Sequence, residues 1–161
     1  MITHYRIDCR LVHGQTTTVL RKQYPCDGII VVDDPLVEDE MMCQAYKTAA
    51  GGNIRVLIYT IEKALIQLEK AEASAKNYYV VFRNALTVQT LIQRGYRFKG
   101  DITVGPQSAR SGTIDYIFGI SLTDEEAAAM DFISSQGINL LCNPFENRTS
   151  MPWEKVREKK Q

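Results

Sequence analysis

The sequence contains neither a long apolar run nor an excess of charge of one sign. Its clearest apolar runs, residues 28–32 and 78–82, are far shorter than the roughly 20 residues that a transmembrane helix needs. Nineteen basic residues balance nineteen acidic ones, so no overall field attracts the chain to nucleic acid or to anionic lipid. We therefore expect no nucleic-acid partner and no direct insertion into a membrane.

Cysteine is scarce and scattered. The four cysteines include no Cys-x-x-Cys pair, which argues against a disulfide framework and against a structural zinc site. The N-terminal segment also lacks the uninterrupted apolar core of a signal peptide, because His4, Arg6, Asp8 and Arg10 interrupt it. Together these absences predict a cytoplasmic protein with reduced thiols.

Two kinds of segment alternate along the chain. Segments with apolar residues three and four positions apart are typical of amphipathic helices, and Thr123-Asp124-Glu125-Glu126 matches a capping box at a helix start. The other segments are short, apolar and rich in β-branched or aromatic residues, as in strands that are buried on both faces. These expected strands are residues 2–7, 28–32, 54–58, 78–82, 101–104, 114–120 and 138–142.

Repeated alternation of strand and helix predicts an α/β fold. We expect a doubly wound, mostly parallel seven-stranded sheet with helices on both faces. Residues 1–161 are long enough for one domain and awkwardly short for two. Residues 143–161 have no periodicity and contain Pro144 and Pro152, so we expect an irregular C-terminal tail there.

The loop after the first strand carries the densest set of reactive side chains. In a doubly wound fold, functional groups gather at the carboxyl ends of the strands. The segment 6–15 reads R-I-D-C-R-L-V-H-G-Q and holds His13, one of two histidines, with Arg10 nearby. Gly14 lets the chain turn into a helix that begins near Gln15, and free amides at such a helix start bind anions. This combination suits phosphoryl transfer through a nucleophilic imidazole.

The residues alone leave other interpretations open. A lone histidine at a strand end is often a packed or capping residue. Cys9 and His13 could form a thiolate–imidazolium pair, and His4 could join them as a zinc ligand, although the spacing matches no familiar site. Asp8 could orient His13 as a catalytic carboxylate does, or it could simply pair with a neighbouring arginine.

The segment 6–15 resembles the R-I-D-D-R-L-I-H-G-Q signature that opens the IIB components of the mannose/fructose/sorbose class of the bacterial sugar phosphotransferase system. The resemblance covers the chain up to about Cys142 and implies a strand order of 3-2-1-4-5-6-7 with the last strand antiparallel. Four further segments occur in the order that the family shows: I-I-V-V-D-D, V-F-R-N, V-G-P-Q-S-A-R-S-G and S-L-T-D-E-E.

The resemblance implies a phosphocarrier of a phosphoenolpyruvate-dependent system, without a metal or another cofactor. His13 would accept a phosphoryl group from a IIA component, on Nδ1, and pass it to a sugar that enters through the membrane components IIC and IID. Arg10 would neutralise the phosphate and Arg110 would complete the clamp, while Gly14 and Gln15 would supply amides. The chain would then associate peripherally with the membrane permease.

The chain departs from what is usual in the family at three positions. Cys9 replaces the second aspartate of the signature, Leu20 stands where tryptophan is usual, and Thr16 where valine is common. A non-catalytic module that senses phosphate, or an unrelated α/β enzyme with Cys9 as its nucleophile, therefore stays an alternative. Candidates for docking partners are the basic and aromatic residues Arg21, Lys22, Tyr24, Arg83 and Arg110, although a solvated helix face explains Arg21 and Lys22 equally well.

Overall fold

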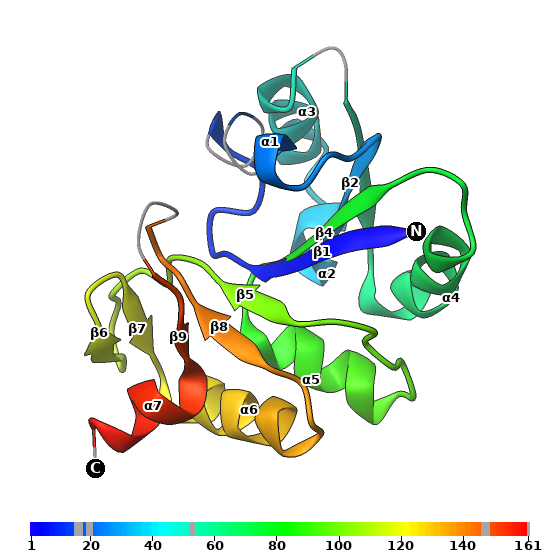
Figure 1. Ribbon diagram of the computed structural model, residues 1–161. Helices are drawn as coiled ribbons and strands as arrows, with labels where there is room; N and C mark the ends of the chain where they lie inside the picture. The colour runs from blue at the N-terminus through cyan, green and yellow to red at the C-terminus, as the bar shows by residue number, and fades with distance from the viewer. Residues whose placement is uncertain (15–17, 19–20, 52–53, 146–148, 161) are drawn as a thin grey trace.

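The computed structural model describes residues 1–14, 18, 21–51, 54–145 and 149–160. At its centre is a seven-stranded sheet in the order β3-β2-β4-β1-β5-β8-β9 (Figure 1). Neighbouring strands run parallel except β9, which is antiparallel to β8. The strands are β1 (Ile2–Ile7), β2 (Gly28–Val32), β3 (Arg55–Tyr59), β4 (Tyr78–Phe82), β5 (Ile102–Val104), β8 (Leu140–Cys142) and β9 (Met151–Pro152).

Helices cover both faces of this sheet. The described helices are α1 (Arg21–Gln23), α2 (Asp34–Val37), α3 (Glu40–Ala49), α4 (Ile61–Glu72), α5 (Ala85–Gln93), α6 (Asp124–Ser135) and α7 (Trp153–Glu158). Successive side chains of β2 enter two different cores. Ile30 and Val32 belong to a larger core with α4, α5 and α6, whereas Ile29 and Val31 belong to a smaller core with α2 and α3. None of the helices that the structure describes has the length and hydropathy of a membrane span.

The predicted α/β fold class is confirmed, including the antiparallel last strand, and the predicted capping box at Thr123 is present. The order of the sheet differs from the expected one at its centre. The expected order placed the first strand beside β2, but β4 lies there, and β1 lies between β4 and β5. Both β1 and β4 are mostly buried, so their apolar content does not determine which of them pairs with β2.

Residues 114–120, expected to form one strand, instead form a hairpin outside the main sheet. Strands β6 (Ile114–Ile117) and β7 (Ile120–Leu122) pair in an antiparallel manner around a turn at Phe118 and Gly119. Gly119 has φ 90°, a left-handed conformation that ends a strand and that glycine adopts without strain. The position beside β5 that we expected this strand to occupy is therefore occupied by β8.

The C-terminal segment is more regular than we expected. Instead of an irregular tail over 143–161, the described part of it contains β9 and α7. Trp153 is buried and donates a hydrogen bond from its indole nitrogen to Asp131 at 2.8 Å, and Val156 is buried one turn later. Burial of these two apolar side chains on α6 stabilises a helix too short to form alone.

Candidate functional site

The loop that follows β1 starts at the centre of the sheet. The amide of Asp8 donates to the carbonyl of Phe82 at the end of β4, at 2.8 Å. The next amide, of Cys9, donates to the carbonyl of Pro106 in the loop after β5, at 3.1 Å. Because both neighbours of β1 bind this loop, its first residues are held at the carboxyl edge of the sheet, where α/β folds place their ligands.

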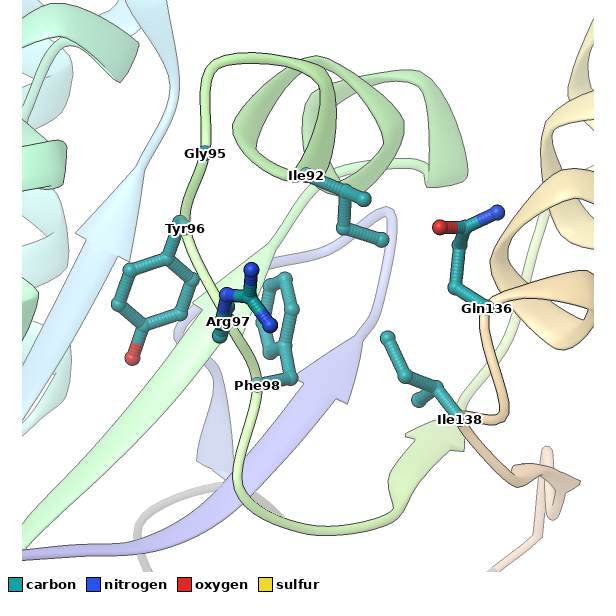
Figure 2. A pocket seen from close by; sticks show the side chains of 7 residues that line it. All are labelled: Ile92, Gly95, Tyr96, Arg97, Phe98, Gln136 and Ile138. Atoms are coloured by element: carbon teal, nitrogen blue, oxygen red, sulfur yellow. The ribbon is translucent and has the colours of Figure 1, made fainter.

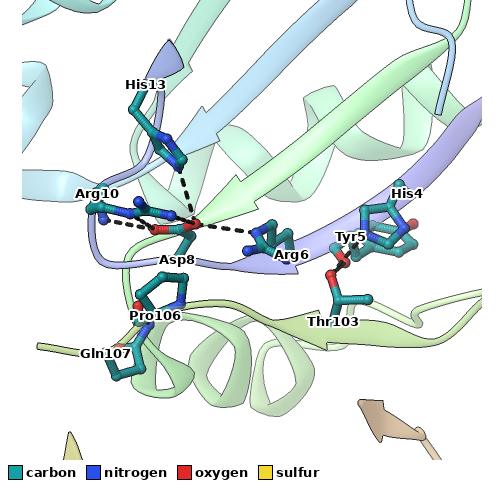
Figure 3. Close-up of polar contacts among 9 residues, drawn as sticks. All are labelled: His4, Tyr5, Arg6, Asp8, Arg10, His13, Thr103, Pro106 and Gln107. Atoms are coloured by element: carbon teal, nitrogen blue, oxygen red, sulfur yellow. Dashed lines mark hydrogen bonds and ion pairs between the residues drawn. The ribbon is translucent and has the colours of Figure 1, made fainter. Parts of the chain in front are cut away.

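A tight turn then directs the chain back over the strand end. The amide of Leu11 donates to the carbonyl of Asp8 at 3.0 Å, and Leu11 has φ 56°, which is rare for a residue other than glycine. Leu11 and Val12 are buried in the smaller core, so packing holds the turn in this conformation. The turn brings the ring of His13 over the carboxylate of Asp8 (Figure 3).

Asp8 is the centre of the polar network. Its fully buried carboxylate lies 3.2 Å from Nε of Arg6, 3.2 Å from Nε of Arg10 and 3.2 Å from Nε2 of His13. The backbone amide of Arg10 donates to it as well, at 3.0 Å. Burial opposes ionisation, but the hydrogen bonds from His13 and Arg10 and the charge of Arg6 outweigh it and lower the pKa of Asp8 to about 2.

The contact with Asp8 determines which nitrogen of His13 can react. An ionised carboxylate only accepts hydrogen bonds, so Nε2 of the ring carries the proton that it shares with Asp8. In the neutral ring, Nδ1 then holds the lone pair. The side chain of His13 is 18% exposed and that of Arg10 38%, so both are accessible to a ligand from solvent. The arrangement presents a nucleophilic nitrogen beside a guanidinium group.

Three of the residues that the sequence analysis singled out come together here, and a fourth, Arg110, has a different partner. Asp8, Arg10 and His13 form one hydrogen-bonded group. Arg110 instead forms an ion pair of 2.7 Å with Glu126, near the start of α6. Gly14 follows His13 and is exposed, while Gln15, like Thr16 and Leu20, lies outside the described residues.

The alternative sites in this loop find no support in the geometry. Sγ of Cys9 lies 3.4 Å from the hydroxyl of Ser108, whereas His13 is turned toward Asp8. His4 is buried, with Nε2 2.8 Å from the hydroxyl of Thr103. Within the described part of the chain, no three His, Cys, Asp or Glu side chains are placed to hold a metal ion.

Two supporting residues escaped the sequence analysis as parts of the site. Arg6 is buried beneath Asp8, and its guanidinium lies against Gly105 at the end of β5. Arg83, expected only to dock partners, donates to both oxygens of Asp33 at 2.9 and 2.7 Å and to the carbonyl of Cys9 at 3.4 Å. Their position in the sequence could have indicated them, since Arg83 and Asp33 each follow the last residue of a strand.

Two cavities lie near opposite ends of the strands, one at the carboxyl ends and one at the amino ends. One, of about 540 Å³, adjoins the site: Arg10 and residues 106–109 line one side of it, and the β6–β7 hairpin lines the other. The second, of about 420 Å³, lies between the ends of α5 and α6 and contains Arg97 and Gln136 (Figure 2). It is formed by residues that precede β5 and β8, so it lies at the amino ends of these strands, away from His13.

Known proteins of one family resemble the chain over nearly its whole length. The model of the family described as PTS system sorbose subfamily IIB component matches residues 2–161. The sorbose-specific EIIB component of Klebsiella pneumoniae is 27% identical over 139 residues, which cover 86% of this chain and 84% of that protein. The fructose-specific EIIB component of Bacillus subtilis is 26% identical over 135 residues, with coverages of 84% and 82%.

Solved structures show the same fold. The IIBSor domain of the sorbose permease from Klebsiella pneumoniae has a TM-score of 0.91 with this chain at 24% identity, over 100% of this chain and 98% of that one. The N-acetylgalactosamine-specific IIB component 1 from Escherichia coli has a TM-score of 0.79 at 25% identity, with coverages of 93% and 97%.

Proposed function

The chain belongs to the sorbose subfamily of IIB components of the phosphotransferase system, and from this premise we propose that it carries a phosphoryl group on Nδ1 of His13. IIB components are phosphotransferase components that work with IIA proteins and with the membrane components IIC and IID. The observation that supports His13 as the carrier is its 3.2 Å contact with Asp8, which directs Nε2 inward and presents Nδ1 as the nucleophile.

The first step is transfer between two histidines. The lone pair of Nδ1 attacks the phosphorus of a phosphohistidine on the IIA protein. A nitrogen–phosphorus bond forms on His13 as the bond in the donor breaks, and the donor imidazole leaves with the electron pair. The phosphorylated ring of His13 gains positive character, which the adjacent carboxylate of Asp8 stabilises.

The second step returns His13 to its starting state. A hydroxyl oxygen of a sugar attacks the phosphorus, the nitrogen–phosphorus bond breaks, and Nδ1 recovers its lone pair while the hydroxyl proton passes to a base. Arg10 neutralises the transferring phosphoryl oxygens in both steps, because its guanidinium is held beside His13 by the same carboxylate. In this proposal Gly14 and Gln15 add backbone amides, and Arg110 closes the clamp.

The proposed partners follow from these two steps. A IIA protein or domain donates the phosphoryl group, and a sugar held by the membrane components IIC and IID accepts it. Both transfers require the carboxyl edge of the sheet to face the partner, because His13 and Arg10 lie there. We accordingly place the chain on the cytoplasmic side of the permease, associated with it through these contacts.

The intact mass of the chain tests the carrier residue. Wild type, His13→Ala and Cys9→Ser are incubated with phosphoenolpyruvate, the two general phosphotransfer proteins and a IIA protein of the mannose class. We expect one acid-labile phosphoryl group on wild type and on Cys9→Ser, and none on His13→Ala. A IIA protein that charges and binds without passing the group on would support a phosphate-sensing module instead. Loss of charging in Cys9→Ser would implicate the thiol.

A further inference from the structure

An aromatic side chain stands at the tip of the β6–β7 hairpin with most of its surface in solvent. Phe118 is 78% exposed, although it is a large apolar residue. It stacks against Phe145, with ring centroids 5.2 Å apart and planes inclined by 26°. Large apolar groups that form a patch on a protein surface commonly mark an interaction site. We call this pair of rings the aromatic rim.

The aromatic rim is held in place by the backbone beneath it. Gly119, with φ 90°, packs so closely that a Cβ atom there would lie 2.9 Å from Pro144 and 3.0 Å from Phe145. The hairpin is also tied to the loop after β5, because the amide of Gln107 donates to the carbonyl of Gly119 and the amide of Ser121 donates to the carbonyl of Gln107, both at 2.9 Å. A surface fixed before binding loses little conformational entropy when a partner docks.

The aromatic rim is continuous with the phosphoryl site. The cavity of about 540 Å³ extends from Arg10, along residues 106–109, to Phe118 and Phe145. Arg10 shares the carboxylate of Asp8 with His13, so the cavity begins at a residue that is bound to the same acid as His13. In Figure 1 the hairpin stands beside the main sheet, at the edge of the molecule. A protein surface that covers His13 would therefore also cover this cavity.

We infer that the aromatic rim and the adjoining cavity are the docking surface for the IIA phosphodonor, an inference that rests on the function proposed above. The donor carries its phosphoryl group on a side chain of its own surface, and that surface must approach until the phosphorus is within bonding range of Nδ1. The permease that holds the sugar must also reach His13, but the chain is proposed to stay associated with it, whereas the donor docks and leaves with every phosphoryl group. Phe118 supplies one apolar anchor, which suits a partner that must dock and dissociate in every cycle.

Separate measurement of the two half-reactions tests this assignment. The first is transfer from phosphorylated IIA to the chain, with the IIA concentration varied. The second is transfer from the phosphorylated chain to sugar in membrane vesicles that contain the permease. The variants are Phe118→Ala, Phe118→Leu, and Ile66→Ala as a matched control, since Ile66 is 58% exposed but lies on α4. Unfolding temperatures verify that each variant folds.

For Phe118→Ala we expect kcat/KM of the first half-reaction to fall about 10- to 100-fold through a higher KM, the size of effect that removal of an interface anchor has. The maximal rate and the final extent of charging stay as in wild type, because His13 is untouched. Phe118→Leu recovers most of the loss, and Ile66→Ala behaves as wild type.

Two results overturn the docking surface while leaving the carrier role in place. One is an unchanged kcat/KM for Phe118→Ala with IIA. The other is a defect confined to the second half-reaction, which would assign the aromatic rim to the membrane components. Failure of the proposed function has a different signature, because wild type itself would then acquire no phosphoryl group.

Discussion

Nε2 of His13 and the backbone amide of Arg10 donate to the same carboxylate, that of Asp8, at 3.2 and 3.0 Å. One buried acid thus fixes the orientation of the imidazole and the path of the loop that carries the guanidinium. Arg6 binds the acid from beneath at 3.2 Å. The consequence is that the proposed nucleophile and the proposed phosphate-binding cation are positioned by a single group, so their geometry changes together.

Asp8→Asn is expected to slow charging of His13 by about two to four orders of magnitude, the range that loss of an orienting carboxylate causes elsewhere. The amide cannot select the tautomer by charge, and it leaves Arg6 buried without its anion, at a cost of about 3 kcal/mol or more in unfolding free energy. Rapid-quench kinetics give the rate, and nitrogen-15 shifts of His13 report the tautomer. Glu62→Gln, an exposed acid on α4, is the control. An unchanged tautomer in Asp8→Asn would contradict the orienting role.

Acid is expected to destabilise the fold through His4. This ring is buried, stacks on Tyr24 at 3.7 Å and faces Thr103, and burial together with the charge of Arg6 lowers its pKa to about 3. A base whose folded pKa lies below its unfolded value of 6.5 contributes its full stability above pH 6.5 and loses it as the pH falls toward 3. The full loss is about 5 kcal/mol.

Urea unfolding between pH 7.5 and 4 measures this loss. This pH range separates the effect of His4 from that of Asp8. The pKa of Asp8 is 3.8 in the unfolded chain and about 2 in the folded one, so its contribution to stability is lost only below about pH 4. His4→Gln keeps a polar side chain that does not titrate, and it should flatten the slope of unfolding free energy against pH. A slope equal to that of wild type would show that other groups cause the acid sensitivity.

Gly105→Ala is expected to disturb the site from below. An added Cβ would lie 2.5 Å from one terminal nitrogen of Arg6 and 2.7 Å from Cζ, so the guanidinium must shift and weaken its contact with Asp8. We expect a loss of about 1 to 3 kcal/mol in stability, as in other overpacked interiors, together with slower charging of His13. Gly100→Ala is a matched control because an added Cβ there meets no atom within 4 Å. Equal stability and equal charging rates in the two variants would show that the small size of Gly105 is not needed to position Arg6.

Arg110→Ala separates a role in binding the phosphoryl group from a role in the ion pair with Glu126. The partner Glu126 also accepts a hydrogen bond from the amide of Thr123 in the capping box, so it stays in place when the arginine is removed. Arg110 is half exposed but Glu126 is buried, so loss of the arginine leaves a buried carboxylate with fewer hydrogen-bond partners and should cost about 1 to 3 kcal/mol in unfolding free energy. If Arg110 contacts the phosphoryl group during transfer in the wild type, its removal slows charging of His13 about tenfold, which corresponds to ~1.4 kcal/mol in the barrier. Stopped-flow transfer from IIA at fixed concentrations measures this, and an unchanged rate would leave Arg110 with the ion pair alone.

The sequence predicted the location of the site better than its internal contacts. The motif and the strand-end rule placed His13 and Arg10 correctly at the carboxyl edge, but they left two roles open for Asp8. Alternation along β1 gives the direction of Asp8 only once the two cores are known, since Tyr5 and Ile7 pack in the larger core and Asp8 therefore points to the opposite side, where it contacts both His13 and the arginines. Partners distant in sequence, such as Arg6 with Gly105, were beyond any local pattern.

Errors in the fold came from short elements. The strand expected over 114–120 ignored the turn signal of Phe118-Gly119, and the tail was expected to be irregular because α7 has too few residues to show a period. Both elements depend on tertiary contacts: Gly119 packs on Pro144, and Trp153 packs against α6. Longer helices such as Ile61–Glu72 carried enough periodic residues to be recognised.

The position of β1 also determines when the site can form during synthesis. This strand is made first, but its two neighbours in the sheet are β4 and β5, paired through contacts such as Ile2 with Tyr78 and Tyr5 with Ile102. At roughly 5–20 residues per second, the ribosome takes on the order of 5–20 s to add those residues. Until then β1 has no partner strand, and the nascent chain carries the future carrier loop unfolded. A chain of half the final length therefore lacks the strand pairing that holds the loop of His13 in place, and it leaves the apolar residues of β1 exposed.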